Sequence, residues 1–347
     1  MKNNNTNRAA LHMSLCAGIL GVAGVFIRSG MGSLLLPLTA VAAIVLLTQL
    51  ALRGLGMLFK RKWNAAKWAV HVCSILLAVL TVLLSVCGLV YAIQDRILFY
   101  NVDDPESRAF LRGKPGYAEV EFAAENGKTY HGMLYRAVNG KAPLVIYFGG
   151  NGEVSYRRLR GLEEDERWDY YAGYHYLYID YEGYGLNEGQ AGQRSMYEEA
   201  MAVYDYAAAL PDVDTSRIVT MGYSMGTGSA VYLALSRPVA GLILAAPYAN
   251  GTELYNNMLP IFYGPFQWLV KQKLPSDKYA PDVTCPALVI ASRSDEMVSF
   301  ASSERLSKLF QGQVDFMELD NAAHNDVFAA EGVYDRVKSF LEEAASK

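Results

Sequence analysis

Ser224 has surroundings that point to covalent chemistry. It is the centre of the stretch GYSMG, which fits the pattern G-x-S-x-G. The pattern lies where an apolar run, RIVTMG, meets an alanine-containing helical run, MGTGSAVYLAL. A serine at such a strand–turn–helix junction takes a tight turn and projects its hydroxyl above the sheet. The alternative is an ordinary glycine-rich turn. The junction favours a nucleophile, with Gly222 and Gly226 required because side chains there would collide with the neighbouring strand and helix.

A nucleophilic serine needs a general base, and the base needs an acid that orients it. His324, in LDNAAHNDVF, follows the last predicted strand and is the only histidine after Ser224. Asp295, in ASRSDEMVSF, follows the predicted strand PALVIAS, which gives the chain order Ser, Asp, His that this type of turn requires. Two acids compete with Asp295: Glu296 is its neighbour and would point elsewhere, and Asp320 is too close to His324 in sequence to orient the ring.

The negative charge that develops on a substrate carbonyl needs backbone N–H groups aimed at it. Met225, the residue after the nucleophile, is expected to supply one of them. The second is expected from the loop GGNGE, which follows the predicted strand PLVIYF and whose glycines allow a close approach to the substrate. Within this loop we predict the Asn151 N–H as the donor, with Gly150 as the next candidate.

Short apolar runs alternate with helical runs from residue 117 onwards. An early hairpin is predicted from AEVEFAA and TYHGMLYRA, with Asn126 and Gly127 at its turn. The remaining runs predict a parallel sheet covered by helices on both faces, with its sites at the carboxyl ends of the strands. The predicted strands are 143–150, 175–185, 217–224, 241–247, 286–292 and 314–320, and the predicted helices are 195–210, 224–236, 301–310 and 331–345.

Five stretches together resemble the α/β-hydrolase superfamily: YFGGNGE, DYEGYGLNEG, GYSMGTG, SRSDEMV and NAAHND. The resemblance covers about residues 97–345 and is strongest to serine hydrolases of the abhydrolase-domain or serine-aminopeptidase-like kind. It implies an α/β-hydrolase fold and no cofactor. The family loop commonly has the form His-Gly-Asn-x-Gly, and Gly149 replaces that histidine here; Asn187 takes the place of a family serine after the fourth strand.

Charge divides the chain near residue 96. Residues 1–96 hold nine basic side chains and one acidic side chain, a net charge of +8. Because the whole chain carries −4, residues 97–347 carry −12. An acidic domain argues against a nucleic-acid partner, since phosphate binding needs a basic face.

Three charge-free apolar stretches occupy the first part, at about 9–27, 33–52 and 69–93. A bilayer core of about 30 Å needs about 20 apolar residues of helix, so each stretch is long enough to span it. The alternatives are buried core helices or, for the first stretch, a cleaved signal peptide. We predict a membrane anchor of three transmembrane helices over 1–96, followed by an α/β-hydrolase domain over 97–347.

The loops between these stretches predict their orientation. The loop 53–67 carries five basic residues, whereas the loop between the first two stretches carries only Arg28. The positive-inside rule places the 53–67 loop and the N-terminus in the cytoplasm. The chain is therefore expected to be a multi-pass protein of the cell membrane, with the hydrolase domain on the extracytoplasmic side.

The segment 248–284 lies where lids are inserted in this fold, and it is rich in aromatic residues. These could line an acyl pocket or contact the membrane, but ordinary packing explains them at least as well. They are Tyr255, Phe262, Tyr263, Phe266 and Trp268. No metal site is expected, because the sequence has no H-E-x-x-H motif and no cluster of cysteines.

The sequence therefore predicts a membrane-anchored serine hydrolase that cleaves esters or thioesters of acyl or lipid-like substrates through an acyl-enzyme. Peptides or amides are the next substrate class. Two other classes stay open: a non-catalytic binding protein of the same fold at the membrane, and a transporter, which the scarcity of polar groups in the apolar stretches disfavours.

Overall fold

The computed structural model describes residues 76, 80, 83–96, 98–171, 173–258 and 260–346. The chain divides between Gln94 and Asp95 into two units, of which the second continues to Lys347. The stretches 9–27 and 33–52, predicted to span a membrane, lie outside the described residues, and 69–93 lies only partly within them. Among the residues that are described, no helix combines the length and the apolar character needed to cross a bilayer.

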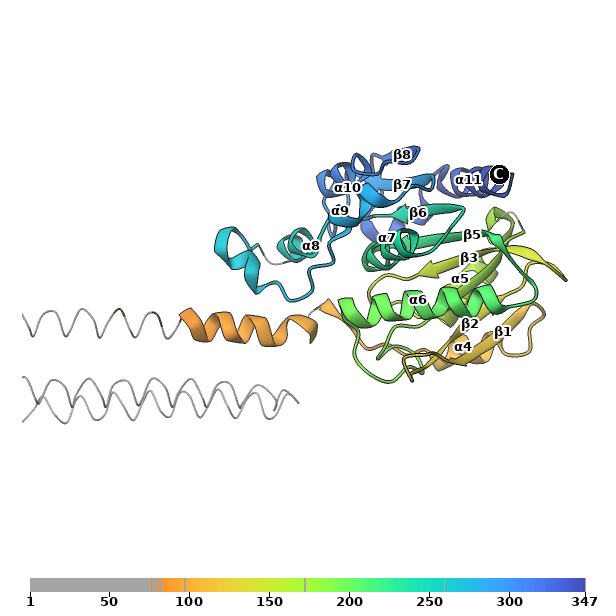
Figure 1. Cartoon of the computed structure of the whole chain (residues 1–347), viewed down its shortest axis with the longest axis horizontal. Coiled ribbons are helices and arrows are strands. Elements are labelled where there is room, and N and C mark those ends of the chain that lie inside the picture. Colours follow the sequence, from red (N-terminus) through yellow and green to blue (C-terminus); the bar gives the residue numbers. More distant parts are fainter. Residues whose placement is uncertain are drawn as a thin grey trace, which may run out of the picture. The chain divides into compact units, whose positions relative to one another are not determined.

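The second unit is built on one eight-stranded sheet with the strand order β1-β2-β4-β3-β5-β6-β7-β8 (Figure 1). The β1–β2 and β2–β4 pairs are antiparallel, and the pairs from β4 through β3 to β8 are parallel. The strands are β1 Tyr117–Ala123, β2 Thr129–Tyr135, β3 Ala142–Phe148, β4 His175–Ile179, β5 Val213–Tyr223, β6 Gly241–Ala245, β7 Ala287–Ser292 and β8 Val314–Leu319. The predicted hairpin and the mostly parallel sheet are confirmed.

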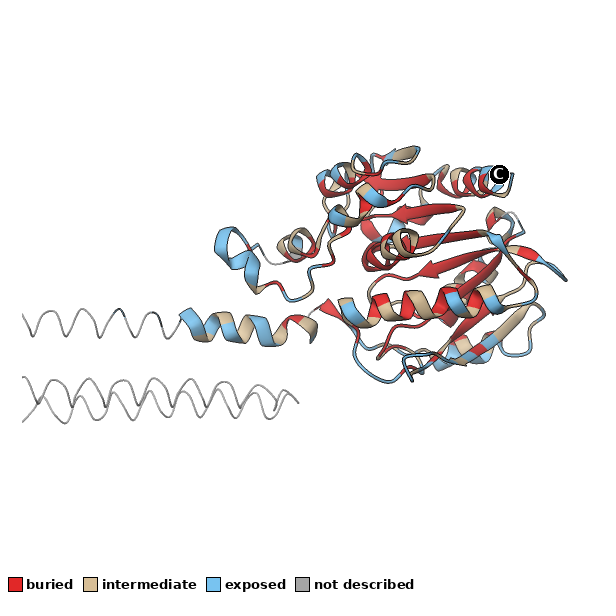
Figure 2. Ribbon diagram, in the orientation of Figure 1, coloured by how far each residue is buried: buried red, intermediate tan, exposed pale blue. Residues whose placement is uncertain are grey.

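The central strands form the core of the sheet, and Figure 2 shows them buried along their length. Every residue of β4, β6 and β7 is buried. Successive side chains of a strand point to opposite faces, so complete burial requires cover on both faces of the sheet. The sequences HYLYI, GLILA and ALVIAS suit this position because they are almost wholly apolar or aromatic.

Helices supply that cover. The helices α6 and α7 pack against each other and against β5, and they lie in front of the sheet in Figure 1. Helix α11 contacts β5, β6 and β7, and it buries one apolar stripe, Val333, Val337, Phe340, Leu341 and Ala344. The helices are α4 Pro105–Leu111, α5 Ser155–Glu164, α6 Gln193–Ala209, α7 Thr227–Ser236, α8 Gly251–Met258, α9 Ser276–Tyr279, α10 Phe300–Ser307 and α11 Val333–Ala345.

Strand β4 is shorter than the predicted strand 175–185, since it ends at Ile179. The next residue, Asp180, still donates its N–H to the His131 carbonyl of β2 at 3.0 Å, but its carboxylate accepts hydrogen bonds from the Ser155 N–H (2.6 Å) and hydroxyl (3.0 Å). Gly183 and Gly185 follow with φ of +81° and +54°, conformations that end a strand. The tyrosine-rich run therefore becomes a loop that is bonded to the start of α5.

Candidate active site

Ser224 lies in the sharp turn between β5 and α7. Strand β5 ends at Tyr223, and a single 3₁₀ turn, η3 (Ser224–Gly226), leads into the helix. Ser224 has φ of +49°, a left-handed conformation that is costly for a residue with a side chain. Such strain is tolerated where the surrounding structure enforces it, and here it turns the hydroxyl towards His324.

Two glycines permit this turn by allowing close backbone contact. A Cβ atom on Gly222 would lie 2.7 Å from the Gly226 carbonyl oxygen, inside the turn itself. A Cβ atom on Gly226 would lie 2.1 Å from the Phe148 carbonyl oxygen at the end of β3. Both distances are shorter than any real contact, so the G-x-S-x-G pattern follows from the packing of the turn against its own helix and the neighbouring strand.

His324 joins the serine to the acid. Its Nε2 lies 2.8 Å from Ser224 Oγ, and its Nδ1 lies 2.8 Å from Asp295 Oδ2. The His324 and Asp295 side chains are only 7% and 2% exposed. The loop after β7 supplies Asp295, and the 3₁₀ turn η6 (His324–Ala329) after β8 supplies His324. The structure thus brings together the three residues that the sequence predicts as the triad.

Backbone groups fix the acid in place. Asp295 Oδ1 accepts hydrogen bonds from the N–H groups of Met297 and Val298, each at 2.8 Å. Both oxygens lie near His324 Nδ1, Oδ2 at 2.8 Å and Oδ1 at 3.0 Å. The tautomer of a histidine is set by the hydrogen bond that its other nitrogen makes, and a carboxylate beside Nδ1 holds the proton of His324 on that nitrogen. The Nε2 lone pair is then free to accept the serine proton.

The rival acids have other contacts. Glu296 Oε2 accepts a hydrogen bond from the His324 backbone N–H at 3.1 Å, so it holds the main chain of the base and not its ring. The Asp320 backbone carbonyl accepts a hydrogen bond from the Ser294 hydroxyl at 2.8 Å. Sequence reasoning missed the positioning contact of Glu296, which its place beside Asp295 could have suggested.

Tyr223 is a second positioning residue that the sequence analysis missed. Its hydroxyl donates a hydrogen bond to the His324 carbonyl at 2.9 Å, and its ring stacks on the imidazole with centroids 5.3 Å apart. Burial raises the pKa of the Tyr223 hydroxyl, which keeps it protonated as a donor. The residue between Gly222 and Ser224 thus supports the base as well as the turn.

The loop after β3 approaches the nucleophile. A Cβ atom on Gly150 would lie 3.6 Å from Ser224 Cβ. The Gly150 N–H, however, donates to Glu153 Oε2 at 2.9 Å, whereas within the described part of the chain the Asn151 N–H donates to no protein acceptor. Of the two predicted loop donors, Asn151 is therefore the one with a free N–H. Met225 follows Ser224 at the start of the helical turn, where N–H groups lack intrahelical partners.

Glu153 explains why this loop has no histidine at position 149. The Tyr178 hydroxyl donates to the Glu153 carbonyl at 3.0 Å, and a Cβ atom on Gly149 would lie only 1.8 Å from that hydroxyl. The Glu153 carboxylate also accepts a hydrogen bond from the Tyr147 hydroxyl at 3.0 Å. The tyrosines and Glu153 hold the loop from below and occupy the space that a side chain at Gly149 would need.

Asp180 anchors the other end of the same loop. Its carboxylate accepts the Ser155 N–H in the first turn of α5, which has no side-chain cap at Val154, and it also accepts the Ser155 hydroxyl. Burial, which outweighs those hydrogen bonds, raises the pKa of Asp180 to about 7. The Asn187 amide donates to the Asp180 carbonyl, so the residue at the family serine position helps to hold the loop that follows β4.

A cavity of about 380 Å³ lies beside the triad. Its lining includes both loop residues predicted as donors and the chain neighbours of the nucleophile and the base, Tyr223 and Asn325. Arg158 and Phe328 also line it, with the guanidinium 4.5 Å from the centre of the ring. The described residues that line the cavity do not include Ser224, Asp295 or His324, so it adjoins these three residues through their neighbours.

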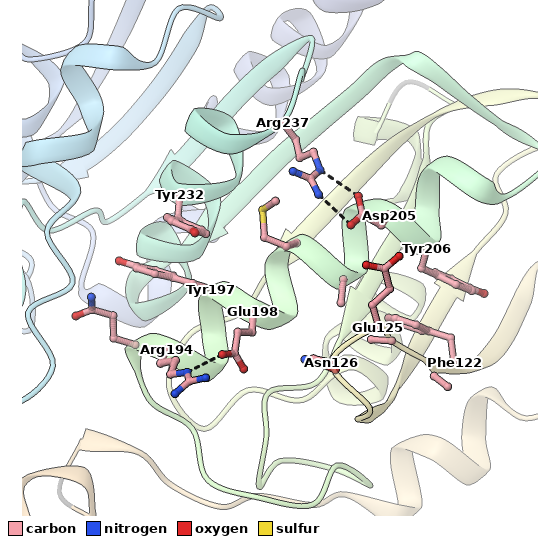
Figure 3. Close-up of a pocket in the computed structure, with 15 residues that line it drawn as sticks. Phe122, Glu125, Asn126, Arg194, Tyr197, Glu198, Asp205, Tyr206, Tyr232 and Arg237 are labelled. Carbon is pink, nitrogen blue, oxygen red and sulfur yellow. Dashed lines mark hydrogen bonds and ion pairs between the residues drawn. The ribbon is translucent and has the colours of Figure 1, made fainter.

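A larger pocket, of about 820 Å³, lies along α6 and is drawn in Figure 3. It is lined by the stacked rings of Tyr197 and Tyr232, 4.1 Å apart, and by the ion pair of Arg237 with Asp205 at 3.0 Å. The described residues that line it include no serine, cysteine or histidine, so a nucleophile with a base is missing there. Within the described residues, no group of three or more side chains is suited to hold a metal ion.

The chain is similar in sequence to one family model and to several known proteins. A family model described as serine aminopeptidase, S33, matches residues 170–279. An uncharacterized protein of Mycobacterium tuberculosis is 29% identical over 265 residues, which cover 74% of this chain and 90% of the relative. The α/β hydrolase domain-containing protein WAV2 of Arabidopsis thaliana is 23% identical over 284 residues, with the same two shares.

Solved structures share the fold. An esterase of Pyrococcus furiosus is 20% identical, with a TM-score of 0.56, and the match covers 71% of this chain and 98% of the esterase. Est1E of Butyrivibrio proteoclasticus, solved with ferulic acid, is 21% identical with a TM-score of 0.55, over 66% of this chain and 100% of that structure. At these identities the two matches show a common fold.

Proposed function

We propose that this chain, which belongs to the α/β-hydrolase superfamily, is a serine hydrolase that cleaves carboxylic esters or thioesters of acyl or lipid-like substrates. The observation that carries the proposal is the continuous contact from Ser224 Oγ through both nitrogens of His324 to Asp295, with 2.8 Å at each end. A buried serine in a strained turn, bonded to a base that is itself oriented by an acid, is the arrangement that activates a hydroxyl for attack.

The reaction follows from these contacts. Ser224 Oγ attacks the carbonyl carbon while His324 Nε2 takes its proton, and Asp295 stabilises the imidazolium that forms. The carbonyl oxygen becomes an oxyanion, which accepts hydrogen bonds from the N–H groups of Met225 and Asn151. His324 then protonates the leaving alcohol or thiol, and an acyl-enzyme is left. Water, deprotonated by His324, attacks the acyl carbon and releases the acid and the serine.

Peptides and amides are the second substrate class, and the family model supports them because its description is that of an aminopeptidase. A purely binding function is disfavoured by the triad, because a binding protein does not need a strained serine in contact with a base. Ester and amide hydrolysis share the acyl-enzyme, so comparing an ester with the matching amide on the purified protein separates the substrate classes.

We further propose that the three apolar stretches anchor the chain in the cell membrane, with the hydrolase domain on the extracytoplasmic side. The support is the length of each charge-free stretch and the five basic residues of the loop 53–67. Protease added to intact cells should then cleave or release the hydrolase domain. A domain that is protected until the cells are broken would reverse the orientation.

The hydrolase proposal is tested by the turnover of 4-nitrophenyl esters of increasing acyl length by the detergent-solubilised full chain. Ser224→Ala is expected to abolish turnover. Ser229→Ala is the matched control, because this buried hydroxyl in α7 has no hydrogen-bond partner among the residues that the structure describes, and its loss should leave the rate unchanged. Unchanged turnover in Ser224→Ala would show that the activity arises elsewhere.

A further inference from the structure

The connection between β6 and β7 exposes an unusual group of apolar side chains, which we call the aromatic segment (residues 261–269). Every residue from 263 to 268 is exposed. Trp268 is 83% exposed, Tyr263 62%, and Phe266 and Ile261 41% each. Two of the aromatic residues of the segment 248–284, Tyr255 and Phe262, are buried, and their ring centroids lie 5.6 Å apart. Ordinary packing therefore explains only those two.

The aromatic segment is held in this exposed position by its own contacts. At its start, the Phe262 N–H donates to Asn256 Oδ1 at 2.8 Å, and the Asn256 amide returns a bond to the Phe262 carbonyl at 3.2 Å. Its middle forms the 3₁₀ helix η4 (Gly264–Leu269). Near its end, Lys273 Nζ donates to the Gln267 carbonyl at 3.0 Å. A fixed, exposed apolar patch of this kind marks a surface that binds a partner.

The position of the aromatic segment points to the partner. Asp95, the first residue of the hydrolase unit, accepts a hydrogen bond from the Gln272 amide at 2.7 Å and pairs with Lys271. Both partners follow the aromatic segment directly. The predicted third span ends at residue 93, and two residues of chain reach at most about 7 Å. The residues that follow the aromatic segment are thus bonded to Asp95, which is two residues of chain from the end of the predicted third span.

The composition of the aromatic segment suits the same partner. The run IFYGPFQWLV, residues 261–270, has no charged residue, and the lysines at 271 and 273 follow at once. Tryptophan and tyrosine favour the boundary between lipid headgroups and acyl chains. A second copy of the chain would bury the same rings, but it would not account for their position beside Asp95.

The aromatic segment is also connected to the triad. The Asn257 amide, at the end of α8, donates to the Met297 carbonyl at 3.1 Å. Met297 is itself 41% exposed, and its N–H donates to the carboxylate of Asp295. The helix that precedes the aromatic segment is therefore bonded to the loop that holds Asp295.

We infer that the aromatic segment inserts into the headgroup–acyl boundary of the bilayer that anchors the chain, so that acyl substrates reach Ser224 from the lipid. This inference rests on the membrane anchor of the proposed function. It assigns a role to a segment outside the triad and narrows the substrate class to lipid-borne or membrane-partitioned acyl compounds.

Tryptophan emission tests the inference on the full chain in nanodiscs. Two lipids are compared, phosphatidylcholine and the same lipid with bromine near the glycerol end of its acyl chains, because bromine quenches a tryptophan that it contacts. The contribution of Trp268 is the difference in emission between the wild type and Trp268→Phe. Trp168→Phe gives the matched control, since Trp168 stacks on Tyr135 with ring centroids 3.8 Å apart, in the contact of η2 (Trp168–Tyr171) with β2.

We expect the Trp268 contribution to be lost in brominated nanodiscs and retained in unbrominated ones, with the Trp168 contribution the same in both. A Trp268 contribution that is unaffected by bromine, whether acrylamide in the water quenches it or not, overturns the inference. If the protein enters nanodiscs but bromine does not quench Trp268, only the role of the aromatic segment is contradicted. A protein that fails to enter them contradicts the anchor, and the inference with it.

Discussion

Replacing Asp295 by asparagine should inactivate the triad by fixing the wrong tautomer of His324. Asp295 Oδ1 accepts two backbone N–H bonds, from Met297 and Val298, each at 2.8 Å. In Asp295→Asn only the amide oxygen can accept them, so the oxygen stays at the Oδ1 position and the NH₂ group takes the Oδ2 position, which is the nearer of the two to His324 Nδ1, at 2.8 Å against 3.0 Å. The NH₂ group would donate to that nitrogen and favour the tautomer with the proton on Nε2, where it blocks the transfer from Ser224.

The magnitude follows from the cost of the opposite orientation. Turning the amide would give up two hydrogen bonds worth about 1 kcal/mol each and set two donors against the NH₂ group. The blocking orientation is then favoured by at least about 2 kcal/mol, or roughly thirtyfold. The same change in other serine triads lowers kcat about 10⁴-fold, or about 5 kcal/mol of transition-state stabilisation, and we expect a similar loss here.

The assay is kcat and KM for a 4-nitrophenyl ester, measured on the wild type, Asp295→Asn and Glu296→Gln. Glu296→Gln is the matched control, because its amide oxygen can still accept the His324 backbone N–H. We expect Glu296→Gln to stay within about tenfold of the wild type, since only one hydrogen bond loses its charge. An Asp295→Asn protein that kept kcat within tenfold of the wild type would refute this account of the acid.

Three further changes test other parts of the structure. Gly226→Ala places a Cβ atom 2.1 Å from a carbonyl oxygen of β3, so it should lower the free energy of unfolding by about 3 kcal/mol, seen as a fall in Tm, and a Tm equal to that of the wild type would contradict the packing. Glu153→Ala removes the acceptor of the Gly150 N–H and should lower kcat by about 10²-fold with a smaller change in KM, whereas Glu153→Gln should recover most of the rate; equal rates for the two variants would exclude a role for that acceptor. Burial raises the pKa of Asp180 from 3.8 to about 7, so the folded state binds this proton more tightly than the unfolded state. The protonated carboxyl therefore makes its full contribution to the free energy of unfolding below about pH 4, and that contribution is lost as the pH rises to about 7. Asp180→Asn keeps an acceptor without the charge. In chemical denaturation, the free energy of unfolding of this variant relative to the wild type should rise by up to about 4 kcal/mol between pH 4 and pH 8. If that relative free energy did not change with pH, the pKa of Asp180 would not be raised by folding.

The grouping of Ser224, Asp295 and His324 could be predicted from the sequence because these residues leave local patterns. Ser224 lies in a short motif at a strand–helix junction, and His324 and Asp295 each follow an apolar run in the required order. The parallel sheet was predictable for the same reason, since buried strands such as GLILA and ALVIAS are continuous apolar runs. These features depend on residues close together in the chain or on the order of elements.

Contacts between distant segments could not be predicted. The Glu153 carboxylate accepts the Gly150 N–H, and the Tyr178 hydroxyl bonds to the Glu153 carbonyl. The sequence ranked Asn151 ahead of Gly150 as the donor, but it could not show the contact that occupies the Gly150 N–H. The end of β4 depends on the bonds of Asp180 to the start of α5, whereas its apolar pattern continues to residue 185. The exposure of Trp268 likewise depends on how the β6–β7 connection folds, which its composition does not reveal.

The most direct test of the central claim is labelling of the detergent-solubilised full chain by a fluorophosphonate probe, which bonds only to an activated serine. The wild type is compared with Ser224→Ala and His324→Ala. We predict that the wild type is labelled, that Ser224→Ala is not, and that His324→Ala is labelled far more slowly because Oγ has lost its base. Labelling of Ser224→Ala at the rate of the wild type, or no labelling of the wild type under conditions in which the probe labels another serine hydrolase, would contradict the claim that Ser224 is the nucleophile.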